Sequence, residues 1–139
     1  TSPRRELKRT STRPLGVKHV RVRMRLGVIV VLRVRGRIVR RLDARALTVR
    51  RSKALRLLEL RLVNRGNVTE RLARDGLRLS LLSEGWKVAT LRPRSRELLP
   101  HSTGIAVFPY RGALRGDVLA RVALRPPVSG PRRSFRVRL

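Results

Sequence analysis

The sequence predicts an all-β protein built as an antiparallel sandwich, and three observations lead to that prediction. Apolar and charged residues alternate with a period of two over several short segments, which gives each segment one aliphatic and one charged face. Turn-forming residues interrupt these segments every ~8–12 residues, the spacing typical of a sandwich. No segment has the sustained i, i+3, i+4, i+7 apolar spacing of an amphipathic helix.

The composition favours a folded chain despite its charge. The chain of 139 residues has 36 Lys+Arg against 8 Asp+Glu, a formal net charge of +28. Disorder requires low hydrophobicity as well as high charge, and here 41% of the residues are hydrophobic, mostly leucine, valine, isoleucine and alanine. The length fits one domain, or one domain with part of a neighbour.

The first third of the chain divides into a basic segment and two strands. Residues 1–14 are basic and without pattern, which predicts a flexible segment. The alternation over residues 17–26 and the apolar run over residues 28–34 each predict a strand. We interpret residues 15–42 as the last strands of a preceding sandwich and residues 43–139 as the main sandwich.

The first strands of the main sandwich are expected at residues 46–49 and 58–62. In the second of these, leucine alternates with a glutamate and an arginine. It ends in the Asn-Arg-Gly-Asn turn of residues 64–67, where glycine and asparagine tolerate a positive φ. The alternatives considered are a short helix over residues 54–62 and a helical turn over residues 70–73.

The later strands follow the same rule. A turn at residues 83–85 joins two of them, and Pro109 predicts an edge or bulge position for another. The only tryptophan, Trp86, opens a strand and is expected to pack in the core, with an exposed platform for a ligand as the alternative. The strands are expected at residues 77–81, 86–91, 103–110, 118–124 and 134–139.

Two stretches of the main sandwich resemble a known kind of domain. One is the strand that ends in Asn-x-Gly-Asn at residues 58–68, with the hairpin strand at residues 85–91. The other is the Leu-Pro-x-Ser-Thr-Gly run at residues 99–104, followed by Phe-Pro-Tyr at residues 108–110. Together they resemble the immunoglobulin-like modules of bacterial surface proteins of the WxL-interacting type and of related actinobacterial secreted proteins.

The resemblance implies an immunoglobulin-like sandwich that follows an N-terminal sandwich assigned to peptidoglycan binding. We expect the start of that first domain to precede residue 1, so no binding residue is carried over from the family. The density of arginine departs from the family's pattern.

The catalytic inventory predicts that the chain is not an enzyme. The acidic residues form no motif of a general acid/base pair, and no hydrolase, phosphate-loop or dinucleotide motif occurs. The histidines His19 and His101 are isolated and cysteine is absent, so we expect no metal site and no cofactor. Each histidine is expected to be an ordinary strand or loop residue.

The arginines of the first strands are the candidate binding residues. A strand places every second side chain on one face, and an arginine's planar fork donates two hydrogen bonds to a phosphate or carboxylate. The alternatives are a surface that binds polyanions and a face that is only solvated and screened by counterions. The candidates for polyanion binding are Arg21, Arg23, Arg25, Arg33 and Arg35.

Two further features limit the classes of partner that the sequence predicts. The chain has one tryptophan, one tyrosine and two phenylalanines, too few for the aromatic platforms on which RNA-binding sheets stack bases. The longest apolar run, residues 28–32, is far short of the roughly 20 residues of a membrane helix, so we expect no transmembrane segment.

We therefore expect a non-catalytic binding or adhesion module of the cell envelope, extracellular or at the cell surface. Its expected partner is an anionic cell-wall polymer, peptidoglycan or another surface protein. The alternative is a cytoplasmic, nucleic-acid-binding basic β-protein of ribosomal type, motivated by the net charge. Non-specific nucleic-acid binding fits either hypothesis. An accessory module of an enzyme is the third possibility.

Overall fold

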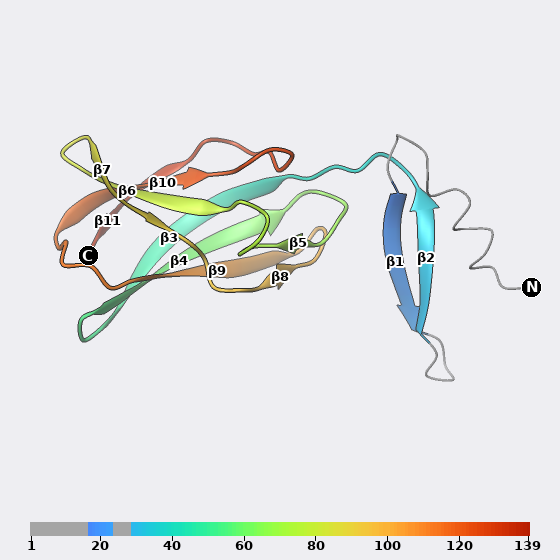
Figure 1. The fold of residues 1–139 in the computed structure, drawn as a ribbon, viewed down its shortest axis with the longest axis horizontal. Helices are drawn as coiled ribbons and strands as arrows, with labels where there is room; N and C mark the ends of the chain where they lie inside the picture. Colours follow the sequence, from blue (N-terminus) through green and yellow to red (C-terminus); the bar gives the residue numbers. More distant parts are fainter. Residues whose placement is uncertain (1–16, 24–28) are drawn as a thin grey trace, which may run out of the picture. The chain divides into compact units, whose positions relative to one another are not determined.

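The structure, a computed structural model, describes residues 17–23 and 29–139, with side chains from residue 36 onward. The regular secondary structure of these residues is β-strand throughout, with no helix among them, and the strands pair in antiparallel sheets (Figure 1). The predicted all-β fold is therefore confirmed. The chain divides into two compact units, Thr1–Val39 and Arg40–Leu139.

The smaller unit contains one antiparallel hairpin. It pairs β1 (Val17–Arg23) with β2 (Ile29–Arg35), from Val17 opposite Arg35 to Arg23 opposite Ile29. Both predicted strands are present, and residues 24–28, which include parts of each predicted range, lie outside the described residues. The flexible segment expected at residues 1–14 also lies outside them.

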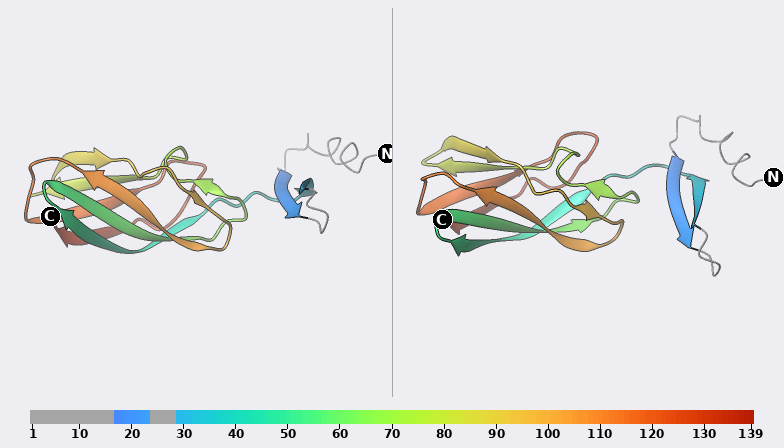
Figure 2. Two further views of the ribbon diagram at one scale, coloured as in Figure 1. Left: turned by 90° about the horizontal axis from the view of Figure 1, so that it is seen from below. Right: turned by 60° about the horizontal axis from the view of Figure 1, so that its bottom comes forward.

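The larger unit is a sandwich of two main sheets with a small two-stranded sheet at one end (Figures 1 and 2). One main sheet has the order β3-β4-β9, the other has the order β11-β10-β6-β7, and β5 pairs with β8. The strands are β3 (Leu42–Ser52), β4 (Leu55–Asn64), β5 (Glu70–Arg71), β6 (Arg78–Ser83), β7 (Trp86–Leu91), β8 (Glu97–Leu98), β9 (Thr103–Tyr110), β10 (Asp117–Ala123) and β11 (Ser134–Arg138).

The chain passes between the two main sheets of the sandwich more than once. The chain makes the β3–β4 hairpin in one sheet and the β6–β7 hairpin in the other, returns to the first with β9, and closes the second with β10 and β11. Such crossing connections between two facing antiparallel sheets are Greek-key connections. A bridge between Arg41 and Ser129 also ties the start of β3 to the segment before β11.

The core lies between the two main sheets and follows the predicted alternation. Leu58, Leu60 and Leu62 of β4 are fully buried, and Leu79 and Leu81 face them from the other sheet. Each fully buried leucine contributes about 1.5–3 kcal/mol relative to an exposed one. Because these leucines alternate in a strand, the helix considered for residues 54–62 is wrong. Residues 70–73 begin with a strand residue pair and continue into a turn rather than a helix.

A tyrosine fixes the connection between the two sheets at residues 111–116. Tyr110 ends β9, and its hydroxyl accepts a hydrogen bond of 3.1 Å from the backbone N–H of Leu114. A Cβ at Gly112 would collide with the Tyr110 ring, so glycine permits this close approach. The connection, which bears Arg115, is thus held against the core by the buried Tyr110.

The later strands match their predictions closely, with one error in packing. β7 and β9 have the expected bounds, and β9 is the edge strand that Pro109 predicted. Trp86, however, is 77% exposed, so the prediction that it packs in the core is wrong. The reason is that β7 is itself an edge strand, and Trp86 pairs with Ser83 beside the turn, next to an irregularity in the β6–β7 register.

The boundary between the units falls before β3 begins. Leu42, which the sequence interpretation assigned to the preceding domain, is buried in the core of the larger unit. Its N–H donates to the Ser129 carbonyl at 2.9 Å, and a Cβ at Gly130 would collide with the Leu42 carbonyl. The close crossing of these two segments anchors the start of the larger unit.

Candidate polyanion-binding surface

The predicted arginine candidates lie on the hairpin of the smaller unit. The register places Arg21 opposite Val31, Arg23 opposite Ile29, Arg33 opposite His19 and Arg35 opposite Val17. These four arginine positions therefore share one face of the hairpin, and none of them is directly opposite another. Arg25 lies outside the described residues.

The larger unit holds most of the charge. Of the 36 Lys+Arg in the chain, 24 lie in Arg40–Leu139, together with seven of the eight Asp+Glu. All of these basic residues are exposed except three half-buried arginines, Arg40, Arg56 and Arg78. The environments of these three differ, and the difference identifies the candidate binding site.

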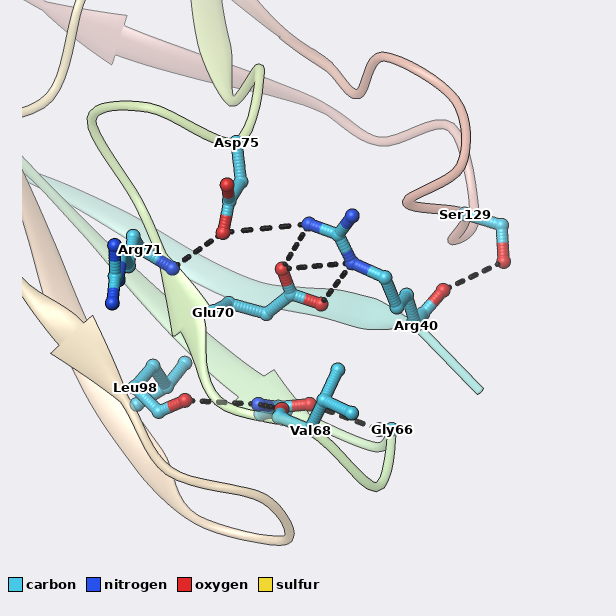
Figure 3. Close-up of polar contacts among 9 residues, drawn as sticks. Arg40, Gly66, Val68, Glu70, Arg71, Asp75, Leu98 and Ser129 are labelled. Carbon is cyan, nitrogen blue, oxygen red and sulfur yellow. Dashed lines mark hydrogen bonds and ion pairs between the residues drawn. The ribbon is translucent and has the colours of Figure 1, made fainter. Parts of the chain in front are cut away.

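Arg40 is paired with carboxylates at the end of the larger unit where β3 begins, here named the Arg40 end (Figure 3). Its Nη2 lies 2.7 Å from Glu70 Oε1 and 3.4 Å from Asp75 Oδ2, and its Nε donates to both Glu70 oxygens. Asp75 also accepts a 2.6 Å hydrogen bond from the Arg71 N–H. The Arg40 carbonyl accepts from the backbone N–H of Ser129 at 3.0 Å. One arginine thus ties together β5, the turn after it and the segment before β11.

Burial is the largest influence on the pKa of Glu70 in this pair. The Glu70 side chain is completely buried, which raises its pKa, and the nearby Asp75 carboxylate acts in the same direction, while the hydrogen bonds from Arg40 oppose both. The hydrogen bonding to Glu70 raises the pKa of Arg40. The arrangement is a structural lock, because every charged group in it is directed at another part of the same fold.

Asn64 forms a second lock beside the first. Its amide nitrogen donates to the carbonyls of Val68 and Leu98, both at 2.9 Å, and its oxygen accepts from the Gly66 N–H at 2.9 Å. Figure 3 shows Leu98, Val68 and Gly66 below the Arg40 lock. The Asn-x-Gly-Asn turn is therefore fixed to β8 by its first side chain, a contact that sequence alone did not indicate.

A third acidic residue at the Arg40 end gathers three arginines. Asp43 is buried, and its Oδ2 lies 3.3 Å from both Arg45 and Arg65, while its Oδ1 lies 3.8 Å from Arg133. The other ion pairs of the unit are Arg50–Glu59 at 3.6 Å and Arg71–Glu97 at 3.7 Å. Five of the seven acidic residues are thus engaged by arginines of the same unit.

The opposite end of the larger unit, here named the hairpin end, contains a different kind of arginine. It comprises the turn at Lys53 and Ala54 between β3 and β4 and the connection of residues 111–116, which Figure 1 shows at the same end as the C-terminus. Here Arg56 has no ion pair among the described residues. Burial lowers the pKa of Arg56, and the nearby Arg115 and Arg51 lower it further.

Arg78 has a similar but less organised environment. Burial lowers its pKa, with Arg92 and Arg125 adding to the effect, and its Nη1 donates to the Leu77 carbonyl at 2.7 Å. The side chains of Arg92 and Arg125 have no hydrogen bond or ion pair with the described part of the chain, and the Arg125 backbone carbonyl accepts from the Val128 N–H at 3.1 Å. The sequence did not single out Arg56 or Arg78, because only the fold reveals which arginines lack a carboxylate.

Two open grooves lie on the larger unit. One, of about 350 Å³, runs between β10 and the segment before β11, with Arg121 and Arg132 on its walls. The other, of about 210 Å³, is lined by Arg71, Arg74 and Arg96. Both grooves present guanidinium groups, and neither brings together residues of a catalytic constellation.

The two histidines lie in different units of the chain. His19 is a strand residue opposite Arg33, and His101 lies in a turn with φ 58°. Among the described residues, no three histidine or acidic side chains gather closely enough to hold a metal ion. The same residues include no helix of the length and hydropathy that a membrane crossing requires.

Comparison with known proteins adds no family. Scans against protein-family models, curated proteins and solved structures found no match to this chain.

Proposed function

We propose that the chain is a non-catalytic binding module of the cell envelope that attaches to an acidic polymer through its basic surface. The observation behind this proposal is the distribution of partners among the arginines. The acidic residues of the larger unit occupy six arginines in ion pairs, and most other cations of the unit are exposed on a rigid sandwich without a carboxylate partner.

The aromatic residues favour a polymer that is recognised by charge rather than by stacking. Phe108 and Tyr110 are buried, and Phe135 packs against the core, which leaves Trp86 as the exposed aromatic side chain of the described chain. Proteins that bind single-stranded nucleic acids stack successive bases on several aromatic rings. An anionic wall polymer requires only cations at suitable spacing.

The proposal agrees with the resemblance to WxL-interacting surface proteins and with an extracellular or surface location. In such a setting the partner is an anionic wall polymer, peptidoglycan or another acidic surface protein. Arginine suits all of these, because its fork donates two parallel hydrogen bonds to a phosphate or carboxylate.

The test is sedimentation of the full chain with purified bacterial cell walls, before and after chemical removal of their phosphate-rich polymers. We expect co-sedimentation with intact walls at about 0.15 M salt, weaker retention on stripped walls, and release as salt rises. Duplex DNA and single-stranded RNA serve as competitors of similar charge. The proposal fails if the chain does not sediment with walls, and tight binding to one nucleic-acid sequence or shape at that salt would favour the ribosomal-type alternative.

A further inference from the structure

The hairpin end brings three arginines together from two segments that are distant in sequence. Arg51 and Arg56 are directly opposite each other in the β3–β4 register, and Arg115 comes from the connection after β9. Like charges directly opposite on neighbouring strands destabilise a sheet. A folded protein that keeps such a pair, with a third cation beside it, gains stability from a bound anion.

Backbone carbonyls hold the three guanidinium groups in place. Arg56 Nη1 donates to the Lys53 carbonyl at 2.8 Å, and Arg115 Nη2 donates to the next carbonyl, that of Ala54, at 3.1 Å. Two guanidinium groups therefore bind consecutive carbonyls of the same turn, in which Lys53 has a φ of 50°.

The remaining anchors complete this arrangement. Arg115 Nη1 donates to the carbonyls of Gly112 and Leu114, and Arg51 Nη2 donates to the Arg138 carbonyl at 3.1 Å. Carbonyls accept hydrogen bonds without neutralising the charge. The three arginines are thus oriented in advance while their positive charges stay uncompensated, which lowers the entropy cost of binding an anion.

A second observation concerns Arg56 itself. Its Nε is buried and donates no hydrogen bond within the protein, one of two such buried side-chain atoms in the described chain. A buried donor without a partner is costly, so the site is incomplete as it stands. None of Arg51, Arg56 and Arg115 forms an ion pair with a described acidic residue.

We propose that Arg51, Arg56 and Arg115 form a binding site for a phosphate group. Three guanidinium groups from β3, β4 and the connection after β9 suit a tetrahedral group with several acceptor oxygens better than a planar carboxylate, which one fork can satisfy. This inference rests on the proposed function and specifies it, because it names phosphate as the group recognised on the acidic polymer. Free phosphate and a phosphodiester polymer offer the same chemistry and are separated by the experiment.

The experiment uses the full chain and three polymer or ion probes: inorganic phosphate, a glycerol-phosphate polymer and polyglutamate. Arg56→Gln and Arg115→Gln are the test variants, and Arg61→Gln is the matched control. Arg61 lies on the same strand as Arg56, is exposed and forms no ion pair with a described residue, so its replacement removes the same charge away from the site.

We expect the glycerol-phosphate polymer to bind each test variant about tenfold more weakly than the wild type and the control by less than about twofold. The affinity for polyglutamate should be nearly the same in the test variants and in the control variant. Amide NMR signals of Lys53, Ala54 and residues 112–115 should move first when inorganic phosphate is titrated into the wild type. Unchanged signals elsewhere in the spectra of the variants establish that the variants fold. Because Arg115 lies in an exposed loop, its substitution disturbs the fold less than that of the half-buried Arg56.

The outcomes separate the two proposals. If the wild type binds the polymer and the test and control variants lose affinity for it equally, the phosphate site is overturned and the proposal of a binding module still stands. Phosphate shifts confined to the hairpin end, without binding to walls or polymer, would support the site for free phosphate and reject the module. Absence of both binding and shifts rejects both.

Discussion

The two ends of the larger unit use the same residue type for different purposes. At the Arg40 end, Arg40, Arg45, Arg65 and Arg133 are turned toward the buried or half-buried carboxylates of Glu70, Asp75 and Asp43. At the hairpin end the arginines are held by carbonyls of the backbone.

The difference between carboxylate and carbonyl partners determines what remains for a ligand. A carboxylate neutralises its arginine, and the pair then serves as a cross-link within the fold. A carbonyl orients the guanidinium group and leaves its charge available. Net charge alone therefore does not locate a polyanion site in an arginine-rich protein, whereas the identity of each arginine's partner does.

The largest expected effect is on stability at the Arg40 end. Replacing Arg40 by methionine leaves Glu70 buried without its partner and should lower the free energy of unfolding by about 3 kcal/mol, the lower end for a broken buried pair because Arg40 is partly exposed. Urea denaturation measures the loss. A midpoint equal to that of the wild type would contradict the structural role of the lock.

The second effect concerns Asn64, whose side chain makes three hydrogen bonds in the same region. Asn64→Ala should cost about 2–3 kcal/mol, because it removes the partners of two carbonyls and one N–H in a buried environment. Thr69→Ala, in the same loop at an exposed position, is the control and should stay within about 0.5 kcal/mol. Comparable losses in both variants would show that the loop, not the amide, is sensitive.

The third effect is a pH dependence at Glu70. Because burial raises its pKa, the stabilising contribution of the protonated form is fully present below the ordinary pKa of glutamate and is lost as pH rises through the raised value. Glu70→Gln keeps the neutral form at every pH. The variant should therefore gain stability relative to the wild type as pH rises above the ordinary pKa of glutamate, about 4.3, as followed by urea midpoints. A relative gain by the wild type over that range would mean that Arg40 outweighs burial.

The smallest stability effect is expected at the hairpin end. Arg56→Gln removes a charge that burial and two neighbouring arginines already disfavour, so the loss of its two carbonyl hydrogen bonds is largely offset. Its urea midpoint should lie close to that of Arg61→Gln. A loss as large as that of Arg40→Met would place Arg56 among the structural arginines and remove the contrast between the ends.

The strands of the larger unit could be predicted because alternation and turn residues are local signals. The leucines of β4, the bounds of β7 and β9, and the edge position of β9 all follow from such signals. The exposure of Trp86 could not be predicted, since it depends on β7 lying at the edge of its sheet.

Less of the candidate site than of the fold could be predicted from the sequence. Alternation singled out the arginines of the smaller unit, where four of the five candidate positions share one face of the β1–β2 hairpin. It gave no indication of Arg51, Arg56 and Arg115, because Arg115 meets the other two only through the connection that Tyr110 fixes. Which arginine has a carboxylate within reach is a property of the tertiary structure.

The most direct test of the contrast between the two ends is the salt dependence of binding to the glycerol-phosphate polymer. The logarithm of the binding constant falls as the logarithm of the salt concentration rises. Removing one cation that contacts a phosphate makes this slope shallower by roughly 0.7–0.9. Arg115→Gln should show that shallower slope, and Arg40→Met, measured under conditions where it is folded, should keep the slope of the wild type. Equal slopes in the two variants would contradict the assignment of structural arginines to one end and binding arginines to the other.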